Sequence, residues 1–308
     1  MTNHKWGSSA TRAALLERQT LMQQIRTFFT QRDVLEVETP IWGQAPVCDP
    51  NIEPVEVASG GFLHTSPEYA MKRLLCDGSG DIFQVCKVFR QGEAGRRHNP
   101  EFSMLEWYRV GWNHHHLMVE VAELSRVLLN KPDLPVAVFT YREALQRYTG
   151  LDMHSSTEAD VRALGVKLAG QDLDLARDGW LDVILSHAME PALPSDTLVF
   201  LHDFPVTQAA LAKLGTAEHG PVAERFELFY NGTELANGYH ELTDADEQRA
   251  RFEQESNGRP LDENLLSAMA TAGLPDCAGV AMGLDRVLMH RLGVETIAEV
   301  LSFDATRA

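Results

Sequence analysis

Two strand-like segments joined by a long polar loop constrain the fold of this chain more than any other feature. Residues 81–90 (DIFQVCKVFR) and 101–110 (EFSMLEWYRV) have the composition of strands, and ten mostly polar residues rich in Gly, Arg and His separate them. Strands joined as a hairpin run antiparallel, and a charged loop much longer than a tight turn is often functional. We therefore expect an antiparallel sheet with a functional loop at this point.

The remaining segments mix helices and strands without a repeating strand–helix–strand order. Apolar spacing predicts a helix over 12–33, followed by a short strand over 34–40 that stops at Pro40. Further strands are expected at 198–204, 225–230 and 279–283, and further helices from 140–143, over 244–254 and 262–272, and from Asp285. This order favours the α+β class over a doubly wound sheet.

Length and composition favour one catalytic domain. We expect residues 1–11 to be a flexible N-terminus and 12–308 to form the domain, with a helical insertion at about 151–197. No apolar run approaches the roughly 18 residues that a membrane helix needs, so no membrane association is expected. Asp and Glu outnumber Lys and Arg by 44 to 27, and this balance disfavours extensive RNA binding.

The cysteines and the histidine run are interpreted as structural features. The four cysteines form no CxxC pair, which indicates reduced, packed thiols in a cytoplasmic protein and does not support a zinc site. His114, His115 and His116 are consecutive, and consecutive side chains of a regular element do not all face one ion. We therefore expect the run to be exposed to solvent.

Three segments place arginines and carboxylates beside turns and strand ends. Arg90 precedes the polar loop, Glu227 and Glu234 flank a turn at Asn231-Gly232, and Arg286 lies in the first turn of the last expected helix. Arginine suits phosphate because its planar fork of donors stays charged. Carboxylate oxygens suit Mg²⁺. Together these residue types are what nucleotide chemistry requires.

Read in order, these segments resemble the class II aminoacyl-tRNA synthetases. Glu36–Pro40 (EVETP) is similar to their motif 1, Phe89-Arg90 with its loop to motif 2, and Gly279–Arg286 (GVAMGLDR) to motif 3. The lysyl branch is indicated by segments 65–69 (TSPEY), 98–102 (HNPEF), 234–238 (ELANG) and 273–275 (GLP). The likeness runs from about residue 12 to residue 301.

The resemblance implies a fold, a reaction and an assembly. It implies the class II catalytic core, an antiparallel sheet of six or seven strands flanked by helices, and a homodimer built on motif 1. Motif 1 lies within the first forty residues, which leaves no room for the anticodon-binding domain of lysyl-tRNA synthetases. This layout is similar to the elongation factor P lysine ligase family. That family uses ATP and Mg²⁺ to activate lysine, preferentially the β-isomer, and transfers it to a lysine side chain of elongation factor P.

The resemblance also implies roles for individual residues. Arg90 and Arg286 would be catalytic and hold the α- and γ-phosphates of ATP, and Glu227 and Glu234 would bind Mg²⁺. The full ATP site would consist of Arg90, Gln91, Glu93, His98, Asn99, Phe102, Glu234, Leu235, Gly283 and Arg286. The amino-acid site would consist of Ser66, Pro67, Glu68, Glu106, Tyr108, Asn237, Glu241 and Ala281, with Glu106, Tyr108 and Glu241 receiving the side-chain ammonium. Ala281 stands where lysyl-tRNA synthetases have glycine, which suits an amino group on the β-carbon.

The motif 2 segment departs from the family pattern. The pattern Phe-Arg-x-Glu places a glutamate where this chain has Gly92, and Glu93 follows one position later. Either Glu93 takes the adenine-side role through the flexibility of Gly92, or the backbone alone contacts adenine.

Three alternatives to transfer onto elongation factor P are retained. Lysyl transfer to tRNA is disfavoured by the acidic charge and the missing RNA domain. A free amino-acid ligase resembling asparagine synthetase is disfavoured by the expected ammonium pocket. A catalytically silent regulatory paralogue is disfavoured because Arg90, Arg286 and both metal carboxylates are present.

Overall fold

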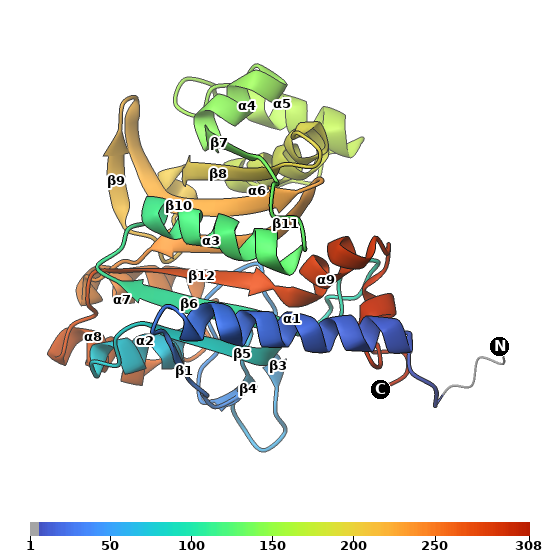
Figure 1. The fold of residues 1–308 in the computed structure, drawn as a ribbon. Coiled ribbons are helices and arrows are strands. Elements are labelled where there is room, and N and C mark those ends of the chain that lie inside the picture. Colours follow the sequence, from blue (N-terminus) through green and yellow to red (C-terminus); the bar gives the residue numbers. More distant parts are fainter. Residues whose placement is uncertain (1–5) are drawn as a thin grey trace.

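The computed structural model describes residues 6–308, and these residues build one large sheet (Figure 1). Within this part of the chain the sheet has nine strands. Eight of them run in the order β1 (Leu35–Glu36), β5 (Ile82–Phe89), β6 (Glu101–Val110), β12 (Cys277–Gly283), β11 (Thr233–His240), β10 (Gly220–Tyr230), β8 (Leu198–Phe204) and β7 (Val136–Thr140), and β9 (Leu214–Ala217) pairs with β10. The α+β class and the antiparallel centre of the sheet are confirmed.

The predicted number of strands, six or seven, is wrong. The additional strands are short edge elements, and two of the pairings, β1 with β5 and β7 with β8, are parallel. The additional strands β7 and β9 have only five and four residues, too few alternating positions to give a sequence pattern, so their pairing depends on the neighbouring strand. Three further short strands, β2 (Trp42–Gly43), β4 (Phe62–Leu63) and β3 (Val55–Glu56), form a separate small sheet.

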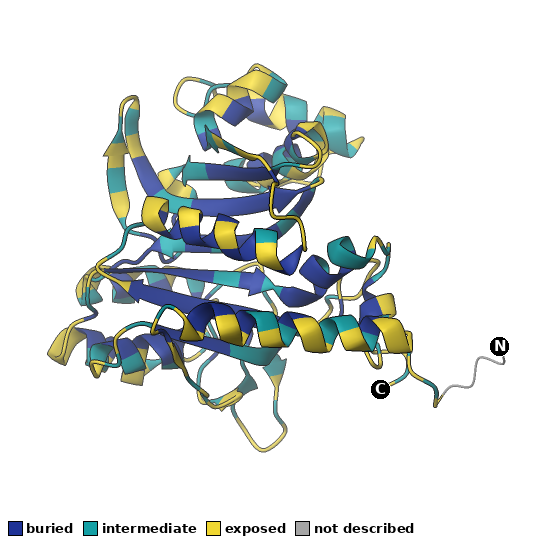
Figure 2. Cartoon of the chain, viewed as in Figure 1, coloured by how far each residue is buried: buried dark blue, intermediate teal, exposed yellow. Residues whose placement is uncertain are grey.

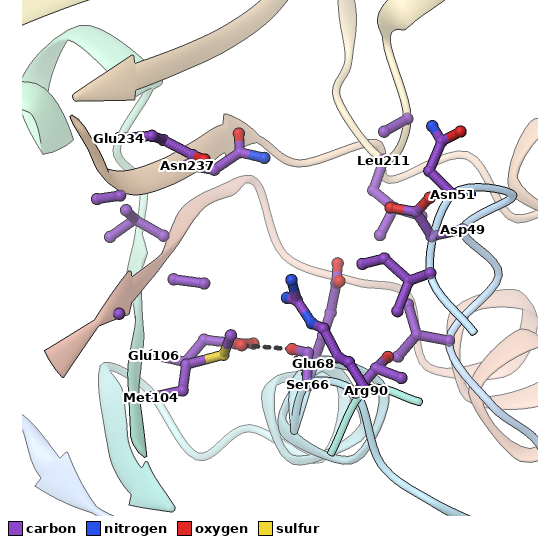
Figure 3. Close-up of a pocket in the computed structure, with 18 of the residues that line it drawn as sticks. Asp49, Asn51, Ser66, Glu68, Arg90, Met104, Glu106, Leu211, Glu234 and Asn237 are labelled. Carbon is purple, nitrogen blue, oxygen red and sulfur yellow. Dashed lines mark hydrogen bonds between the residues drawn. The ribbon is translucent and has the colours of Figure 1, made fainter. Parts of the chain in front are cut away.

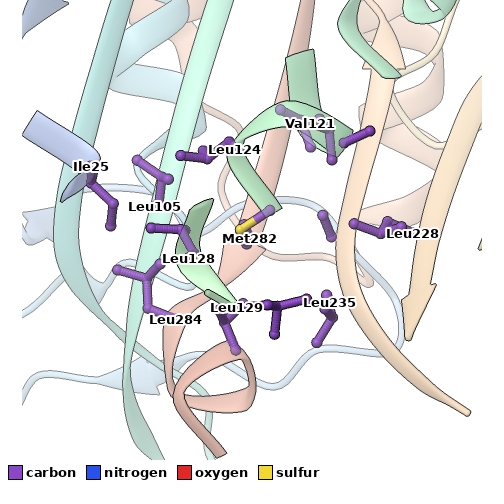
Figure 4. Packing of buried hydrophobic residues seen from close by; sticks show 14 of the residues in the cluster. Ile25, Leu105, Val121, Leu124, Leu128, Leu129, Leu228, Leu235, Met282 and Leu284 are labelled. Carbon is purple, nitrogen blue, oxygen red and sulfur yellow. The ribbon is translucent and has the colours of Figure 1, made fainter. Parts of the chain in front are cut away.

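Helices α1 (Arg12–Thr30), α3 (His114–Leu128) and α9 (Leu284–Leu292) cover one face of the large sheet. In Figure 1, α1 and α3 run across this face side by side, and they contact each other. Leu21 and Ile25 of α1 and Val121 of α3 pack in one cluster with Leu105 and Met282 of the sheet (Figure 4). Figure 2 shows the exposed residues of α1 and α3 on the side away from the strands. This cluster is the principal core.

The other helices surround the edges of the sheet. Helices α2 (Glu68–Cys76), α7 (Ala245–Glu255) and α8 (Glu263–Thr271) share a second cluster near Tyr108. The region expected as a helical insertion contains α5 (Glu158–Ala169), α6 (Arg177–Ile184) and the short helical segments Leu185–Met189 and Glu190–Ala192. Together with α4 (Tyr141–Thr149) it packs around Trp180. Among the helices of residues 6–308, none combines the length and apolar character that a membrane span requires.

Part of the predicted flexible N-terminus is attached to the rest of the domain. Residues 1–5 of the predicted flexible N-terminus lie outside the described part. The amides of Ser9 and Ala10 donate to the carbonyls of Ser302 and Leu301, at 2.8 and 2.9 Å, so this stretch is attached to the C-terminal segment.

All four cysteines are free thiols, and Cys48 and Cys277 are buried as predicted for packed thiols.

The expectation that the histidine run is exposed to solvent is wrong for its first member. Asn113 caps α3 by accepting from the amide of His116 at 3.0 Å, so the run forms the first turn of a helix. Helical periodicity then turns His114 toward the sheet, where it is 4% exposed, whereas His115 and His116 face solvent.

A buried carboxylate joins three elements of the core. Asp285, in the first turn of α9, is 1% exposed. It accepts a hydrogen bond from the amide of Ser103 in β6 at 2.6 Å and forms an ion pair with Arg18 of α1. Arg18 also donates to the carbonyl of Val300 at 2.7 Å. The helix that carries Arg286 is therefore held against both α1 and β6.

Replacement of this carboxylate should destabilise the whole domain. Asp285→Ala leaves Arg18 and the Ser103 amide without their partner inside the protein, and breaking one side of a buried ion pair costs about 3 kcal/mol of unfolding free energy or more. Urea unfolding followed by circular dichroism measures this loss. Glu295→Ala is the matched control, because it removes an exposed pair with Arg96 and should leave the midpoint almost unchanged. Equal midpoints for the two variants would contradict the structural role of Asp285.

Candidate active site

A cavity of about 550 Å³ lies on the sheet face opposite α1 and α3. Successive side chains of a strand point to opposite faces. In β6, Leu105 and Trp107 belong to the core, whereas Met104, Glu106 and Tyr108 line the cavity. The same strands therefore build the core with one face and the site with the other.

The residues predicted to receive the ammonium group lie together at one end of the cavity. Glu106 is 2% exposed and accepts two hydrogen bonds, from the hydroxyl of Ser66 at 2.5 Å and from the hydroxyl of Tyr108 at 2.7 Å (Figure 3). Ser66 and Glu68 lie at the start of α2, next to Glu106. Glu241, 1% exposed, follows β11 and completes this end of the cavity.

Lys72 lies behind this end of the cavity and is not among the residues predicted from the sequence. Lys72 is 1% exposed, and its ammonium nitrogen is 2.6 Å from a carboxylate oxygen of Glu68 and 2.6 Å from one of Glu241. Burial lowers its pKa, but the carboxylates of Glu241 and Glu68 outweigh burial and raise it, so Lys72 is charged. Only its i,i+4 spacing from Glu68 could have suggested the pair.

The cavity end holds more negative than positive groups. Glu68, Glu106 and Glu241 are carboxylates, whereas Lys72, which pairs with Glu68 and Glu241, is the one cationic side chain in an ion pair with this group among the described residues. Burial raises the pKa of Glu106 to about 8, and the neighbouring Glu68 adds to this shift. Burial also raises the pKa of Glu241 to about 7, although Lys72 opposes it. These raised pKa values indicate that a cation is needed to keep the carboxylates charged.

Two small residues of β12 leave room beside the carboxylates. Gly279 pairs with Tyr108 in the sheet, and a Cβ atom there would clash with the Tyr108 ring and the Glu241 carboxylate. Ala281 pairs with Glu106 on one side and with Asn237 on the other. Its methyl group therefore lies at the wall of the cavity between these two residues.

At the other end of the cavity, two arginines are held in place with donors to spare. Arg90 stacks on Phe102, with its guanidinium carbon 5.1 Å from the ring centroid, and its buried Nε has no hydrogen-bond partner among the described residues. Arg286 donates to the carbonyl of Glu234 at 2.9 Å and lies 2.7 Å from Nε2 of His98. These predicted phosphate ligands therefore share one end of the site.

The motif 2 loop brings Glu93 into the cavity. Gly92 adopts the left-handed conformation with φ of 80°, which favours glycine, and Glu93 lines the cavity with its carboxylate 3.5 Å from Arg90. Asn99 also lines the cavity, but its amide group is occupied by the carbonyl of Glu101 and the amide of Ala305. Gln91 does not line the cavity.

The predicted metal carboxylates are only partly arranged for a shared ion. Glu234 lines the cavity, whereas Glu227 lies behind it and forms an ion pair with Arg225. Burial raises the pKa of Glu227 to about 7, and Glu234 and Glu190 add to the shift although Arg225 opposes it. Glu190, which the sequence analysis did not identify, has its own pKa raised to about 7 by burial and by Glu234. Three carboxylates thus crowd one region, and this crowding favours a cation.

The mouth of the cavity is acidic and was not predicted. Its lining includes Asp49, Asn51, Asp178, Asp182 and Glu255, of which Asp49 and Asn51 are labelled in Figure 3. These residues come from separate loops and helices, so no local sequence pattern connects them. Burial raises the pKa of Glu255 to about 7, and Asp49 adds to the shift.

Most predicted site residues meet at this cavity. The phosphate end contains Arg90, Glu93, His98, Asn99, Phe102, Glu234, Leu235, Gly283 and Arg286. The amino-acid end contains Ser66, Glu68, Glu106, Tyr108, Asn237, Glu241 and Ala281. Three predicted residues, Pro67, Gln91 and Glu227, are described in the structure but do not line the cavity.

Comparisons with known proteins agree with this arrangement. Residues 5–307 match the family described as tRNA synthetases class II (D, K and N). The chain is 46% identical to the elongation factor P–(R)-beta-lysine ligase of Klebsiella pneumoniae subsp. pneumoniae, with 98% of each chain covered. It is 44% identical to the protein of the same name from Salmonella dublin over the same shares. The chain therefore belongs to the class II tRNA synthetase family, together with the elongation factor P–(R)-beta-lysine ligases.

Proposed function

We propose that this chain is a ligase that activates a lysine, with (R)-β-lysine as the favoured isomer, as its adenylate and transfers it to a lysine side chain of elongation factor P. Membership of the family implies ATP-dependent ligase chemistry. The names of the relatives support the acceptor and the isomer. ATP at the arginine end, the amino acid at the carboxylate end and a cytoplasmic location are parts of the same proposal.

The charge balance of the carboxylate end carries the proposal. Glu68, Glu106 and Glu241 when ionised exceed Lys72 by two negative charges, and all four side chains are buried or nearly so. A lysine that reacts through its carboxylate keeps two ammonium groups. Such a substrate supplies the missing positive charges and six N–H donors. An amino acid with a neutral side chain would leave one charge unbalanced.

Ala281 supports the β-isomer. Its methyl group lies between Glu106 and Asn237, at the wall where the amino group near the reacting carboxylate would lie. Moving that amino group from the α- to the β-carbon takes it away from the crowded wall. A one-methyl difference changes discrimination by about 1–3 kcal/mol.

The first step would be attack of the amino-acid carboxylate oxygen on the α-phosphorus of ATP. A P–O bond forms to give the acyl adenylate, and the bond to pyrophosphate breaks. Arg90, through its unpartnered Nε, would stabilise charge on the α-phosphate, and Arg286 would hold the γ-phosphate. Because Glu234, His98 and Phe102 fix these side chains, little reorganisation is needed during the reaction.

The carboxylates near Arg286 fit Mg²⁺ in type and charge. Glu234 and Glu227 would hold the ion, with Glu190 adding negative charge nearby. Bound there, Mg²⁺ would neutralise the polyphosphate. Arg225 keeps Glu227 oriented by its ion pair and by donating to Asn237 at 3.2 Å.

The second step would be attack of the acceptor amine on the acyl carbon, which forms an amide and releases AMP. The acidic mouth would attract the cationic lysine of the acceptor. The pKa of Glu255 is about 7, near neutral pH, so this carboxylate of the mouth is the best suited to take the proton of the acceptor ammonium group.

A homodimer is also part of the proposal. The resemblance assigns the subunit contact to the motif 1 region, and this region exposes large apolar side chains: Leu35 at 55%, Ile41 at 41% and Trp42 at 50%. Neighbouring exposed apolar residues of this size are typical of a contact surface.

The activity should be measured in two stages. We expect ATP–pyrophosphate exchange that depends on lysine and is faster with (R)-β-lysine than with α-lysine, followed by a mass increase of elongation factor P by one lysyl group. Arg90→Ala should reduce exchange by about 100-fold or more, because a charge-stabilising donor is lost. If no amino acid supports ATP–pyrophosphate exchange, the chain is the silent paralogue. If tRNA and not elongation factor P receives the lysyl group, the tRNA alternative holds.

Filling the space at Gly279 should weaken amino-acid binding. Gly279→Ala places a methyl group against Tyr108 and Glu241, so KM for the amino acid should rise by about tenfold or more. KM for ATP should change little, because the phosphate end is untouched. Gly43→Ala is the control, since its methyl would meet only the Ala45 carbonyl at 3.4 Å. Equal amino-acid KM values for the two variants would refute this role of Gly279.

Amino-acid binding should strengthen as pH rises. An ammonium group binds the ionised form of Glu106 and Glu241, whose pKa values in the free protein are about 8 and about 7. Affinity should therefore increase between about pH 6 and about pH 8.5, with proton release on binding. Calorimetry in two buffers of different ionisation enthalpy measures the released protons. Glu106→Gln should reduce both the affinity and its pH dependence, and an unchanged pH profile would contradict this assignment.

A further inference from the structure

A cluster of histidines and acidic residues lies on the other face of the sheet, where α3 begins next to β8. His114 and His115 form the first turn of α3, and His202 and Asp203 lie near the end of β8. One donor atom from each of these four residues lies within 4.8 Å of the others. The cluster joins two elements that are far apart in the sequence and has no role in the proposed reaction.

The spacing of the donor atoms in the cluster matches that of ligands that share one metal ion. Nε2 of His114 is 3.3 Å from Oδ1 of Asp203, which is long for a hydrogen bond. Nδ1 of His202 is 3.2 Å from Oδ2 of Asp203 but makes no hydrogen bond with any described residue. Two ligands of a tetrahedral ion with bonds of about 2.0–2.1 Å lie about 3.3 Å apart.

His114 points to a missing partner. It is 4% exposed, and its Nδ1 is buried without a hydrogen-bond partner among residues 6–308. The nitrogen of His114 that faces Asp203 is Nε2. Because no acceptor among the described residues binds Nδ1 and fixes the proton position on this ring, Nε2 is able to present its lone pair to an ion. The rings of His114 and His115 have centroids 4.0 Å apart, and those of His115 and His202 are 5.0 Å apart, which keeps the imidazoles together.

The backbone of β8 is distorted at the acidic member of the cluster. Asp203 has φ of 58°, in the left-handed region that non-glycine residues seldom adopt. The pairing of β8 with β10 shifts between Ala223 and Phe226, so Asp203 stands opposite residues 224 and 225 of a bulge in β10. Bulges re-aim side chains, and strained backbone is concentrated at functional sites.

A neighbouring histidine is less suited to bind an ion. His240 has both ring nitrogens engaged, one by Glu224 and the other by Asp276 at 2.9 Å. A second possible group, His114 with Glu224 and His240, would have to break these contacts. The four-residue cluster therefore carries the argument.

We propose that His114, His115, His202 and Asp203 bind a divalent transition-metal ion, with Zn²⁺ as the best fit. Three imidazoles and one carboxylate suit this class of ion, whereas Mg²⁺ and Ca²⁺ prefer oxygen ligands. Four protein ligands leave no open position, so the ion is structural. It joins the first turn of α3 to β8, which pairs with β10, the strand that carries Arg225 and Glu227. The proposal does not depend on the proposed ligase function.

Metal content provides the test. The full chain is treated with a chelator, dialysed against Zn²⁺ without ATP, and its bound zinc is measured by mass spectrometry. We expect one tightly bound ion in the unmodified chain, and at least about tenfold weaker binding in His115→Ala and in His202→Ala. His116→Ala is the matched control, because His116 lies in the same exposed turn but outside the cluster, and it should bind like the unmodified chain. Circular dichroism checks that each variant is folded.

A second measurement identifies the geometry. Co²⁺ in place of Zn²⁺ should give the strong visible absorption of a four-coordinate site, and this absorption should disappear in His115→Ala. No zinc binding by the unmodified chain, or equal binding by all variants, would overturn the proposal. Equal binding would place the ion elsewhere, for example at Glu227 and Glu234.

Discussion

The two-residue alternation of β6 and β12 is the constraint on which the other features depend. These strands bury Leu105, Trp107 and Met282 in the core beneath α1 and α3, and they present Glu106, Tyr108 and Ala281 to the cavity. A shift of one residue in their pairing would exchange the two sets. The same apolar packing that stabilises the domain therefore sets the spacing of the carboxylates, and Asp285 reinforces it by joining α9 to β6 and α1.

The cavity combines two ends of opposite character. At one end Arg90 and Arg286 retain donors for phosphate. At the other end Lys72 pairs with Glu68 and Glu241, and these two carboxylates together with Glu106 remain short of positive charge. Burial strengthens the electrostatic interactions at both ends with a bound substrate, because charges interact more strongly where water is excluded. A substrate with two ammonium groups balances the charge of the carboxylate end, while its reacting carboxylate points toward the arginine end. This complementarity connects the fold with adenylate formation.

The histidine cluster at α3 and β8 shows how the opposite face of the sheet has chemistry of its own. His114 is buried by helical periodicity, and Asp203 lies near it at the point where β8 faces a bulge in β10. The three consecutive histidines by themselves predict neither the burial of His114 nor its nearness to Asp203. The cluster lies on the sheet face opposite the cavity, so a bound ion would join α3 to β8 without entering the cavity.

The sequence by itself determined the α+β class, the hairpin of β5 and β6, and most of the residues that meet at the cavity. The class and the hairpin follow from local patterns of strand alternation and turn residues, whereas the individual site residues were implied by the resemblance of ordered motifs such as 279–286 to a known family. Only the tertiary structure placed Lys72 between Glu68 and Glu241, turned Glu227 toward Arg225, and gathered Asp49 and Glu255 at the mouth. These positions depend on burial and on contacts between distant segments, and neither leaves a local pattern in the chain. The short strands β7 and β9 and the burial of His114 were missed for the same reason.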